Sequence, residues 1–246
     1  MYKNSKLDKL ILTLCIVMSL SAICIGTSIA SNGEKAEDKV STLNAHEGEY
    51  YKKFLPKGKL YMQAKALIDR SGRQVATIAF KLNDGTIVPN IQTLIRYSED
   101  IIIGKIIENK SYLDDNEEIY TVSKVFVQEA AKGDIVSGSV IKIRRQGGSW
   151  GYADGVFVTK VPVDARLLDN DKNYIIFLNK GDDDQYYDLS AGVQSIYGMD
   201  FSSNSIFPIN LNRNDPMVRR YSNALITDFL VVLHKAVENE KIITVK

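Results

Sequence analysis

The feature that most constrains the fold is a series of short hydrophobic runs, separated by turn residues, between residues 100 and 178. The first run, 100–107, has five isoleucines among its eight residues, which is typical of a strand that is buried on both faces or that curls inside a barrel. Shorter runs follow at 119–128, 139–145, 156–163, 174–178 and 185–189. This spacing predicts a mainly β domain of the α+β class.

Two elements are expected before these runs. Apolar residues alternate over 60–68 and again over 76–82, so 59–88 is predicted to form a β-hairpin, although residues 60–68 could be helical instead. A short helix is expected over 90–98, because Ile91, Leu94 and Ile95 fall on one helical face and Asn90 can cap its start.

The C-terminal part contains a weakly patterned segment and a helix. Residues 191–209 are rich in Ser, Asn and Gly and are predicted to form a long surface loop. An amphipathic helix is expected over 216–240, with Asp215 as its N-cap and Pro216 at its first position. Its apolar stripe is expected to pack on the β domain, and docking of a partner is the alternative.

The first thirty residues predict export. Three lysines precede an uncharged apolar run over residues 10–29, and the order matches a signal peptide (1–30) cut after Ala30. The run also has the roughly 20 residues of a bilayer-spanning helix, so an uncleaved membrane anchor is equally open. Both interpretations predict an apolar N-terminal helix and an extracytoplasmic body, anchored or secreted. Polar residues 31–58 are expected to tether a domain formed by 59–246.

The exported body has no cysteine and little net charge. The only cysteines, Cys15 and Cys24, lie in the apolar run, so the body can have neither disulfides nor thiolate metal sites. The chain carries a formal charge of +1, and its first thirty residues hold three lysines and one aspartate, which leaves about −1 for the body. A body this close to neutrality gives no indication of nucleic-acid binding.

Five short motifs in fixed order carry a resemblance to a known family. They are SEDIIIGKI at 98–106, YTVSKVFV at 120–127, KGD at 132–134, IKI at 141–143 followed by two glycines, and NYIIFL at 173–178. Over about residues 90–190 the chain resembles the netrin-like domain, also found in tissue inhibitors of metalloproteinases, and it looks closest to the bacterial secreted versions of that domain. The resemblance implies an OB-fold, which is a closed β-barrel, and a binding role. It does not imply protease inhibition, which in that family depends on an N-terminal cysteine, because Ser31 follows the predicted cut.

No residue pattern predicts catalysis. His46 and His234 are the only histidines, and the chain has no HExxH, GxSxG or phosphate-cradling GxxxxGK[ST] motif. The acidic clusters at 114–118 and 182–184 lack the ligand spacing of an EF-hand and are expected to be solvated turns. We therefore predict no enzyme activity, no metal site and no cofactor, with a carboxylate-dependent hydrolase as a remote alternative.

Four aromatic residues are the predicted binding residues. Trp150 and Tyr152 lie in a Gly-rich segment, 147–155, which is predicted to be a flexible loop, and Tyr186 and Tyr187 follow an acidic turn. Exposed aromatic side chains on barrel loops commonly bind sugars or proteins, and the alternative is that these four cap the barrel end. We expect an extracytoplasmic binding module for a protein or a cell-wall glycan. The alternative is a structural component of an envelope complex that docks through its C-terminal helix.

Overall fold

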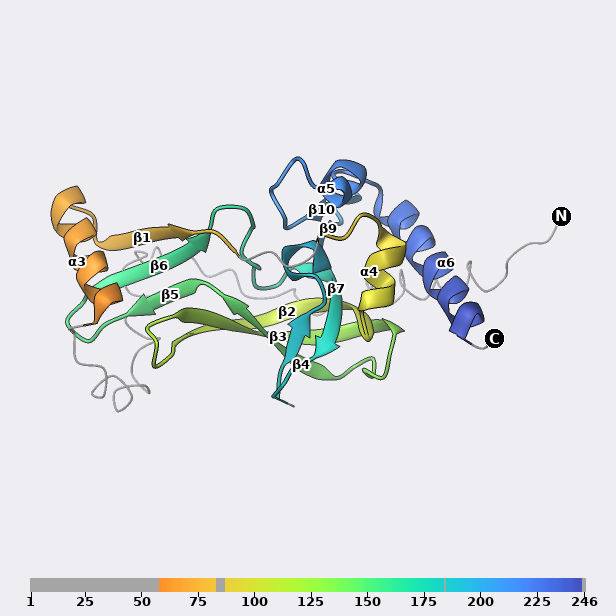
Figure 1. Cartoon of the computed structure of the whole chain (residues 1–246), viewed down its shortest axis with the longest axis horizontal. Coiled ribbons are helices and arrows are strands. Elements are labelled where there is room, and N and C mark those ends of the chain that lie inside the picture. Colours follow the sequence, from red (N-terminus) through yellow and green to blue (C-terminus); the bar gives the residue numbers. More distant parts are fainter. Residues whose placement is uncertain (1–57, 83–86, 184, 245–246) are drawn as a thin grey trace, which may run out of the picture. The chain divides into compact units, whose positions relative to one another are not determined.

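A closed five-stranded barrel organises the part of the chain that the computed structural model describes, residues 58–82, 87–183 and 185–244 (Figure 1). All of these residues belong to one unit, which spans residues 50–246. The barrel strands are β2 (Asp100–Leu113), β3 (Ile119–Lys132), β4 (Val140–Gln146), β7 (Asn173–Lys180) and β8 (Tyr187–Leu189).

The strand order makes the barrel a Greek key. Three consecutive antiparallel strands, β2, β3 and β4, are joined in sequence, and β7 returns to pair antiparallel with β2. Strand β8 pairs parallel with β4 and antiparallel with β7, which closes the sheet. A fourth strand that lies beside the first is the defining feature of this motif. The prediction of a mainly β domain with a closed barrel is confirmed.

Strand β2 is buried on both faces at its start, as its β-branched run indicates. Ile102 and Ile106 belong to the apolar cluster inside the barrel. Ile101 and Ile103, which point the other way, belong to a second cluster beneath the helices. Burial on both faces explains why this run has no polar alternation.

The second cluster lies under three helices and two additional strands. Helices α4 (Ile91–Tyr97), α5 (Pro216–Tyr221) and α6 (Ile226–Thr244) cover it, and β9 (Ile196–Asp200) and β10 (Ser205–Pro208) extend the sheet beyond β7. Helices α4 and α6 lie side by side (Figure 1). The expected cap of α4 is confirmed, since the Asn90 side chain accepts a hydrogen bond from the Thr93 amide at 2.9 Å.

Two predictions for the C-terminal part are wrong. Residues 191–209 are not a surface loop but contain β9 and β10, and Gly198 there allows the Phe207 ring to lie 2.1 Å from where a Cβ would stand. The single helix predicted over 216–240 is two helices, because the chain turns at Asn223 with φ 64°. Its N-cap, Asp215, is confirmed by hydrogen bonds to the amides of residues 217 and 218. The apolar stripe of α6 is buried, which confirms that it packs on the domain.

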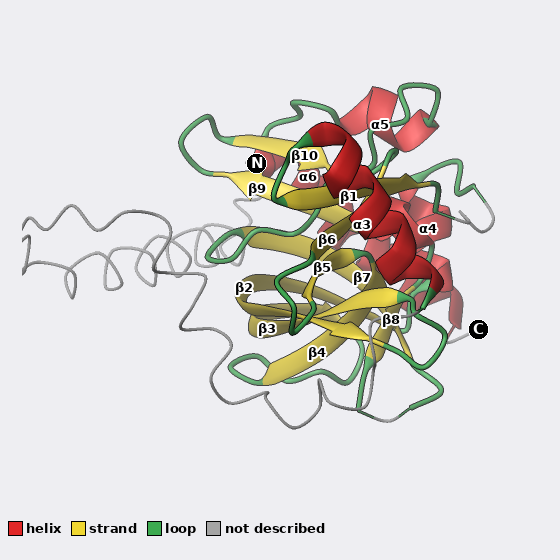
Figure 2. Ribbon diagram, turned by 90° about the vertical axis from the view of Figure 1, so that its left-hand side faces the viewer, coloured by secondary structure: helices red, strands yellow, loops and turns green. Residues whose placement is uncertain are grey.

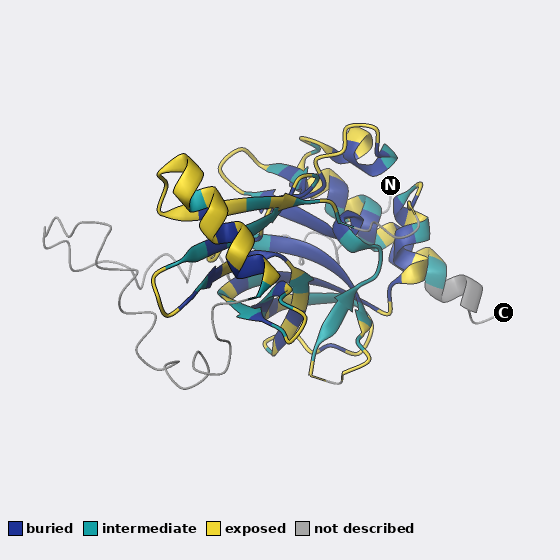
Figure 3. Ribbon diagram, turned by 60° about the vertical axis from the view of Figure 1, so that its left-hand side comes forward, coloured by how far each residue is buried: buried dark blue, intermediate teal, exposed yellow. Residues whose placement is uncertain are grey.

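A smaller three-stranded sheet adjoins the barrel. Its order is β1 (Val75–Phe80), β6 (Phe157–Pro162) and β5 (Gly148–Gly151), and β1 pairs parallel with β6. Helix α3 (Lys59–Ser71) packs on this sheet (Figure 2). It buries Leu60, Tyr61 and Ala64 and exposes its other side (Figure 3). The hairpin predicted over 59–88 is therefore wrong, and the helical alternative for 60–68 holds. Leu60 and Ala64 fit the alternation of a strand, but they are also four residues apart and share a helix face with Tyr61, so the pattern did not distinguish the two structures.

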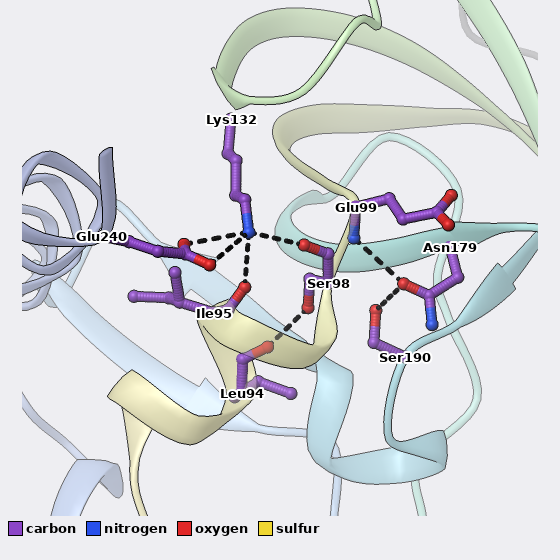
Figure 4. A network of polar contacts seen from close by, with 8 residues as sticks. All are labelled: Leu94, Ile95, Ser98, Glu99, Lys132, Asn179, Ser190 and Glu240. Atoms are coloured by element: carbon purple, nitrogen blue, oxygen red, sulfur yellow. Dashed lines mark hydrogen bonds and ion pairs between the residues drawn. The ribbon is translucent and has the colours of Figure 1, made fainter. Parts of the chain in front are cut away.

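A lysine joins two helices to the end of a barrel strand (Figure 4). Lys132 is the last residue of β3, and its Nζ donates to the carbonyls of Ile95 and Ser98 at 2.8 and 2.7 Å. The same Nζ lies 2.9 Å from a carboxylate oxygen of Glu240 on α6. Carbonyls at the end of α4 therefore find a charged donor, which a helix C-terminus favours.

The expected leader and tether, residues 1–57, lie outside the described residues. Within the described residues, no helix is both long enough and apolar enough to cross a membrane.

Candidate functional site

The outer face of strands β2, β3 and β4 carries a group of cationic and aromatic side chains. Strand register places them on one side of the sheet, because Tyr112 is opposite Tyr120, and Val122 lies between Lys110 and Arg144. Side chains alternate along a strand, so the neighbours of these residues point into the barrel. We call this surface the cationic–aromatic face; its members are Lys110, Tyr112, Tyr120, Lys124, Lys142, Arg144 and Tyr186.

Rings and cations alternate across the strands of this face. Tyr112 and Tyr120 stack with their centroids 5.5 Å apart and their planes at 18°. The Arg144 guanidinium lies 6.0 Å from the centroid of Tyr120 and 5.7 Å from that of Tyr186. The ladder continues at both ends, where Lys142 lies over Tyr186 and Lys110 lies over Tyr112. Such contacts hold the cations in place over the rings.

Positive charge on the face is only partly neutralised. Lys124 forms an ion pair with Glu108, and both side chains are almost half exposed. Among the described residues, no carboxylate forms an ion pair with Lys142 or Arg144, and both residues are exposed. Burial raises the pKa of Tyr120, and the nearby Arg144 opposes that rise. Tyr120 therefore stays neutral at physiological pH and does not offset the positive charge of the face.

One end of the face is apolar. Phe126 and Val140 are opposite each other on β3 and β4, on the same side as Lys124 and Lys142, and are 39% and 52% exposed. These two side chains give the cationic–aromatic face one apolar end.

Of the four predicted binding residues, the structure brings Tyr186 to this face. The prediction that Trp150 and Tyr152 are exposed in a loop is wrong, since each is only 9% exposed and both belong to the core beneath α3. Trp150 lies in β5, and the Tyr152 ring packs edge-on against Tyr61. Tyr187 is half-buried in β8 and packs against the barrel core. The candidate site is therefore the cationic–aromatic face of β2, β3 and β4 and not the segment 147–155.

Sequence reasoning missed the cations of this face because it considered only the net charge of the body. The alternating runs in β3 and β4 place Lys124, Lys142 and Arg144 at every second position of a strand, which puts them on one face. Acidic turns stand at the ends of the same strands, and Asp114 acts on Tyr120, so a sum over the body hides cations and acids that are separated only along the strands. The sequence feature that could have revealed the cluster is the placing of charged residues at alternate positions of the strands.

The described histidine occupies a structural position. His234 on α6 lies 3.4 Å from a carboxylate oxygen of Glu129 on β3. His46 lies outside the described residues. Within the described part of the chain, no three His, Cys, Asp or Glu side chains are grouped closely enough to hold a metal ion.

Comparison of the chain with known protein families and with curated proteins found no match.

Proposed function

We propose that this chain is a non-catalytic, extracytoplasmic binding module of OB type, which holds an anionic glycan of the cell envelope on its cationic–aromatic face. The observation that carries the proposal is the ladder of cations and tyrosines across β2, β3 and β4.

The topology supports the OB assignment. An OB-fold is a five-stranded Greek-key barrel whose ligands bind over its second and third strands and between two of its loops. In this barrel the second and third strands are β3 and β4, and the corresponding loops span residues 114–118 and 181–186. The cationic–aromatic face lies over those strands, and Tyr186 belongs to the second loop.

Ring orientation favours an anionic ligand over a neutral sugar. Neutral sugars usually bind by packing on the open face of an aromatic ring. On this face, one side of the Tyr120 ring stacks on Tyr112 and the Arg144 guanidinium lies over the ring. Lys142 and Arg144 point outward without a carboxylate partner in the described part of the chain, and guanidinium pairs well with phosphate and carboxylate.

The expected export supports a glycan rather than a nucleic acid. The apolar run over 10–29 predicts a body on the outer side of a membrane, anchored or secreted, where phosphate-rich and carboxylate-rich glycans occur. A cysteine-free domain needs no oxidising environment to fold there, because it depends on its apolar core alone.

The test measures binding of the full chain, in a nonionic detergent, to poly(glycerol phosphate) and to neutral dextran. We expect saturable binding to the polyphosphate that weakens as salt rises, and none to dextran. Removing two charges, Lys142→Gln with Arg144→Gln, should weaken binding by at least about tenfold, since each charged hydrogen bond contributes about 1.5–3 kcal/mol. Arg219→Gln with Arg220→Gln, which removes two exposed charges on α5, is the matched control and should bind normally. Equal binding of dextran, or unchanged binding by the double variant, would overturn the proposal.

A further inference from the structure

A second polar site lies on the opposite side of strand β4. A cavity of about 130 Å³ opens between the barrel mouth and β5, and its polar wall comes from the inward-facing positions of β2, β3 and β4. We call it the Arg145 pocket; its polar lining residues are Asn109, Ser111, Thr121, Ser123, Arg145, Gln146 and Ser149. A water molecule occupies about 30 Å³ in the liquid, so the pocket has room for several waters or one tetrahedral oxyanion.

Most polar groups of the pocket wall are already bonded to one another. Thr121 Oγ1 donates to the Gly147 carbonyl at 2.7 Å and lies 3.0 Å from Ser111 Oγ. Ser123 donates to the Asn109 side chain, whose amide donates to the Leu168 carbonyl at 2.9 Å. These bonds fix the wall and leave few of its donors for a ligand.

Arg145 is the exception among these groups. Its guanidinium has five N–H donors, and one of its nitrogens bonds to the Arg166 carbonyl at 3.2 Å. No carboxylate in the described part of the chain forms an ion pair with it. Burial lowers the pKa of Arg145 to about 10, and the nearby Tyr174 opposes that fall. A half-buried cation without a counter-charge is costly, and a bound anion would offset that cost.

Two further charged groups lie at the same end of the barrel as the guanidinium. Arg145, Arg166 and Asp169 all act on the Tyr174 hydroxyl, which accepts a hydrogen bond from the Asp169 amide at 2.9 Å. Arg166 and Asp169 cancel each other, so the positive charge of Arg145 itself is not offset by these two neighbours. The planar fork of arginine can hold two oxygens of one oxyanion at once.

We propose that the Arg145 pocket binds a small oxyanion, a phosphate, sulfate or carboxylate group, through the Arg145 guanidinium. The site is separate from the cationic–aromatic face and does not depend on it. Adjacent residues of β4 serve the two sites, because alternation along the strand sends Arg144 outward and Arg145 inward.

The test follows thermal unfolding of the full chain, in a nonionic detergent, by the fluorescence of its single tryptophan. Sodium phosphate, sulfate and acetate are titrated in separate arms, with sodium chloride holding ionic strength constant. We expect a saturable rise in melting temperature, and the tightest arm identifies the oxyanion. Arg145→Gln should raise the half-saturating concentration by at least about tenfold, as expected for loss of a charged hydrogen bond.

An exposed arginine on another element supplies the control. Arg219→Gln removes the same charge from α5 and should leave the oxyanion titration unchanged. Arg145→Lys, which keeps the charge but lacks the fork, covers the case in which Arg145→Gln fails to fold, and it should also bind about tenfold more weakly. A rise that does not saturate, or that the Arg145 variants retain, would be general salt stabilisation and would overturn the proposal. Loss of polyphosphate binding in the Lys142 and Arg144 double variant would leave this result untouched, so the two proposals fail independently.

Discussion

Replacing Lys132 with methionine tests how the helices are held to the barrel. The ammonium of Lys132 bonds to two carbonyls at the end of α4 and to Glu240 on α6 (Figure 4). Its side chain is 19% exposed and that of Glu240 is 25% exposed, so water replaces these bonds poorly. Methionine keeps the apolar stem and removes only the charge and the donors.

The expected loss of unfolding free energy is about 3 kcal/mol. Each carbonyl left without its charged donor costs about 1 kcal/mol, and the partly buried ion pair adds a similar amount. Glu240→Gln should cost less, about 1 kcal/mol, because Lys132 still bonds to both carbonyls. Urea denaturation of the full chain, followed by far-UV circular dichroism, measures these differences from the midpoint and the slope.

Lys124→Met is the control for this prediction, because it removes a lysine and an ion pair from the same strand. Lys124 and its partner Glu108 are 43% and 44% exposed, and such pairs contribute only about 0–1 kcal/mol. If Lys132→Met destabilised the protein no more than Lys124→Met, the lysine would not hold the helices, and the reasoning would be refuted.

Three further predictions concern a turn, a carboxylate and the buried tryptophan. Gly133 and Gly138 have φ of 91° and 87°, but a Cβ at Gly133 would lie 2.0 Å from a carboxylate oxygen while one at Gly138 would meet nothing within 4 Å. In urea titrations Gly133→Ala should therefore cost about 3 kcal/mol or more and Gly138→Ala about 1 kcal/mol, and equal costs would contradict the steric argument. The hydrogen bond from the Tyr61 hydroxyl lowers the pKa of Asp154, so it stabilises the fold above the usual carboxyl pKa and is lost as pH falls through the lowered value. Tyr61→Phe should raise the pKa of Asp154 in an NMR titration and flatten the acid limb of the stability curve, and an unchanged pKa would exclude this bond as the main cause. Trp150→Ala should cost about 3–5 kcal/mol of unfolding free energy. The folded variant, measured well below its melting temperature, should keep its affinity for the polyphosphate. A loss of affinity without unfolding would show that Trp150 belongs to the binding site.

The barrel strands could be predicted because each one can be recognised from its own residues alone. The runs in β2, β3, β4 and β7 carry enough β-branched and alternating residues to be recognised one at a time. The pairing of β1 with β6 could not be predicted in this way, since it joins segments about eighty residues apart in parallel. Strands β9 and β10 were missed because each is short, and the glycine that lets Phe207 approach resembles a loop residue in the sequence.

The aromatic residues show why a candidate site is harder to predict than a strand. Trp150 and Tyr186 both stand beside turn residues, and the sequence gives them equal claims to exposure. Only tertiary packing distinguishes them: α3 covers the tryptophan, whereas Tyr186 lies over two cations of β4. Residues of that helix were predicted to form half of a hairpin, so the sequence offered no element that could bury the tryptophan.

The register of β4 decides which arginine serves which site. A slip of one residue in the pairing of β3 and β4 would exchange Arg144 and Arg145 between the outer face and the pocket. Gly148 opposes such a slip, since its φ of 133° and the oxygens 2.3 Å from where its Cβ would stand suit glycine alone. The Gly147 amide also donates to the Ile119 carbonyl at 2.8 Å, at the end of the same strand pair. The paired glycines that suggested a flexible loop in the sequence therefore hold the strand that separates the two cationic sites.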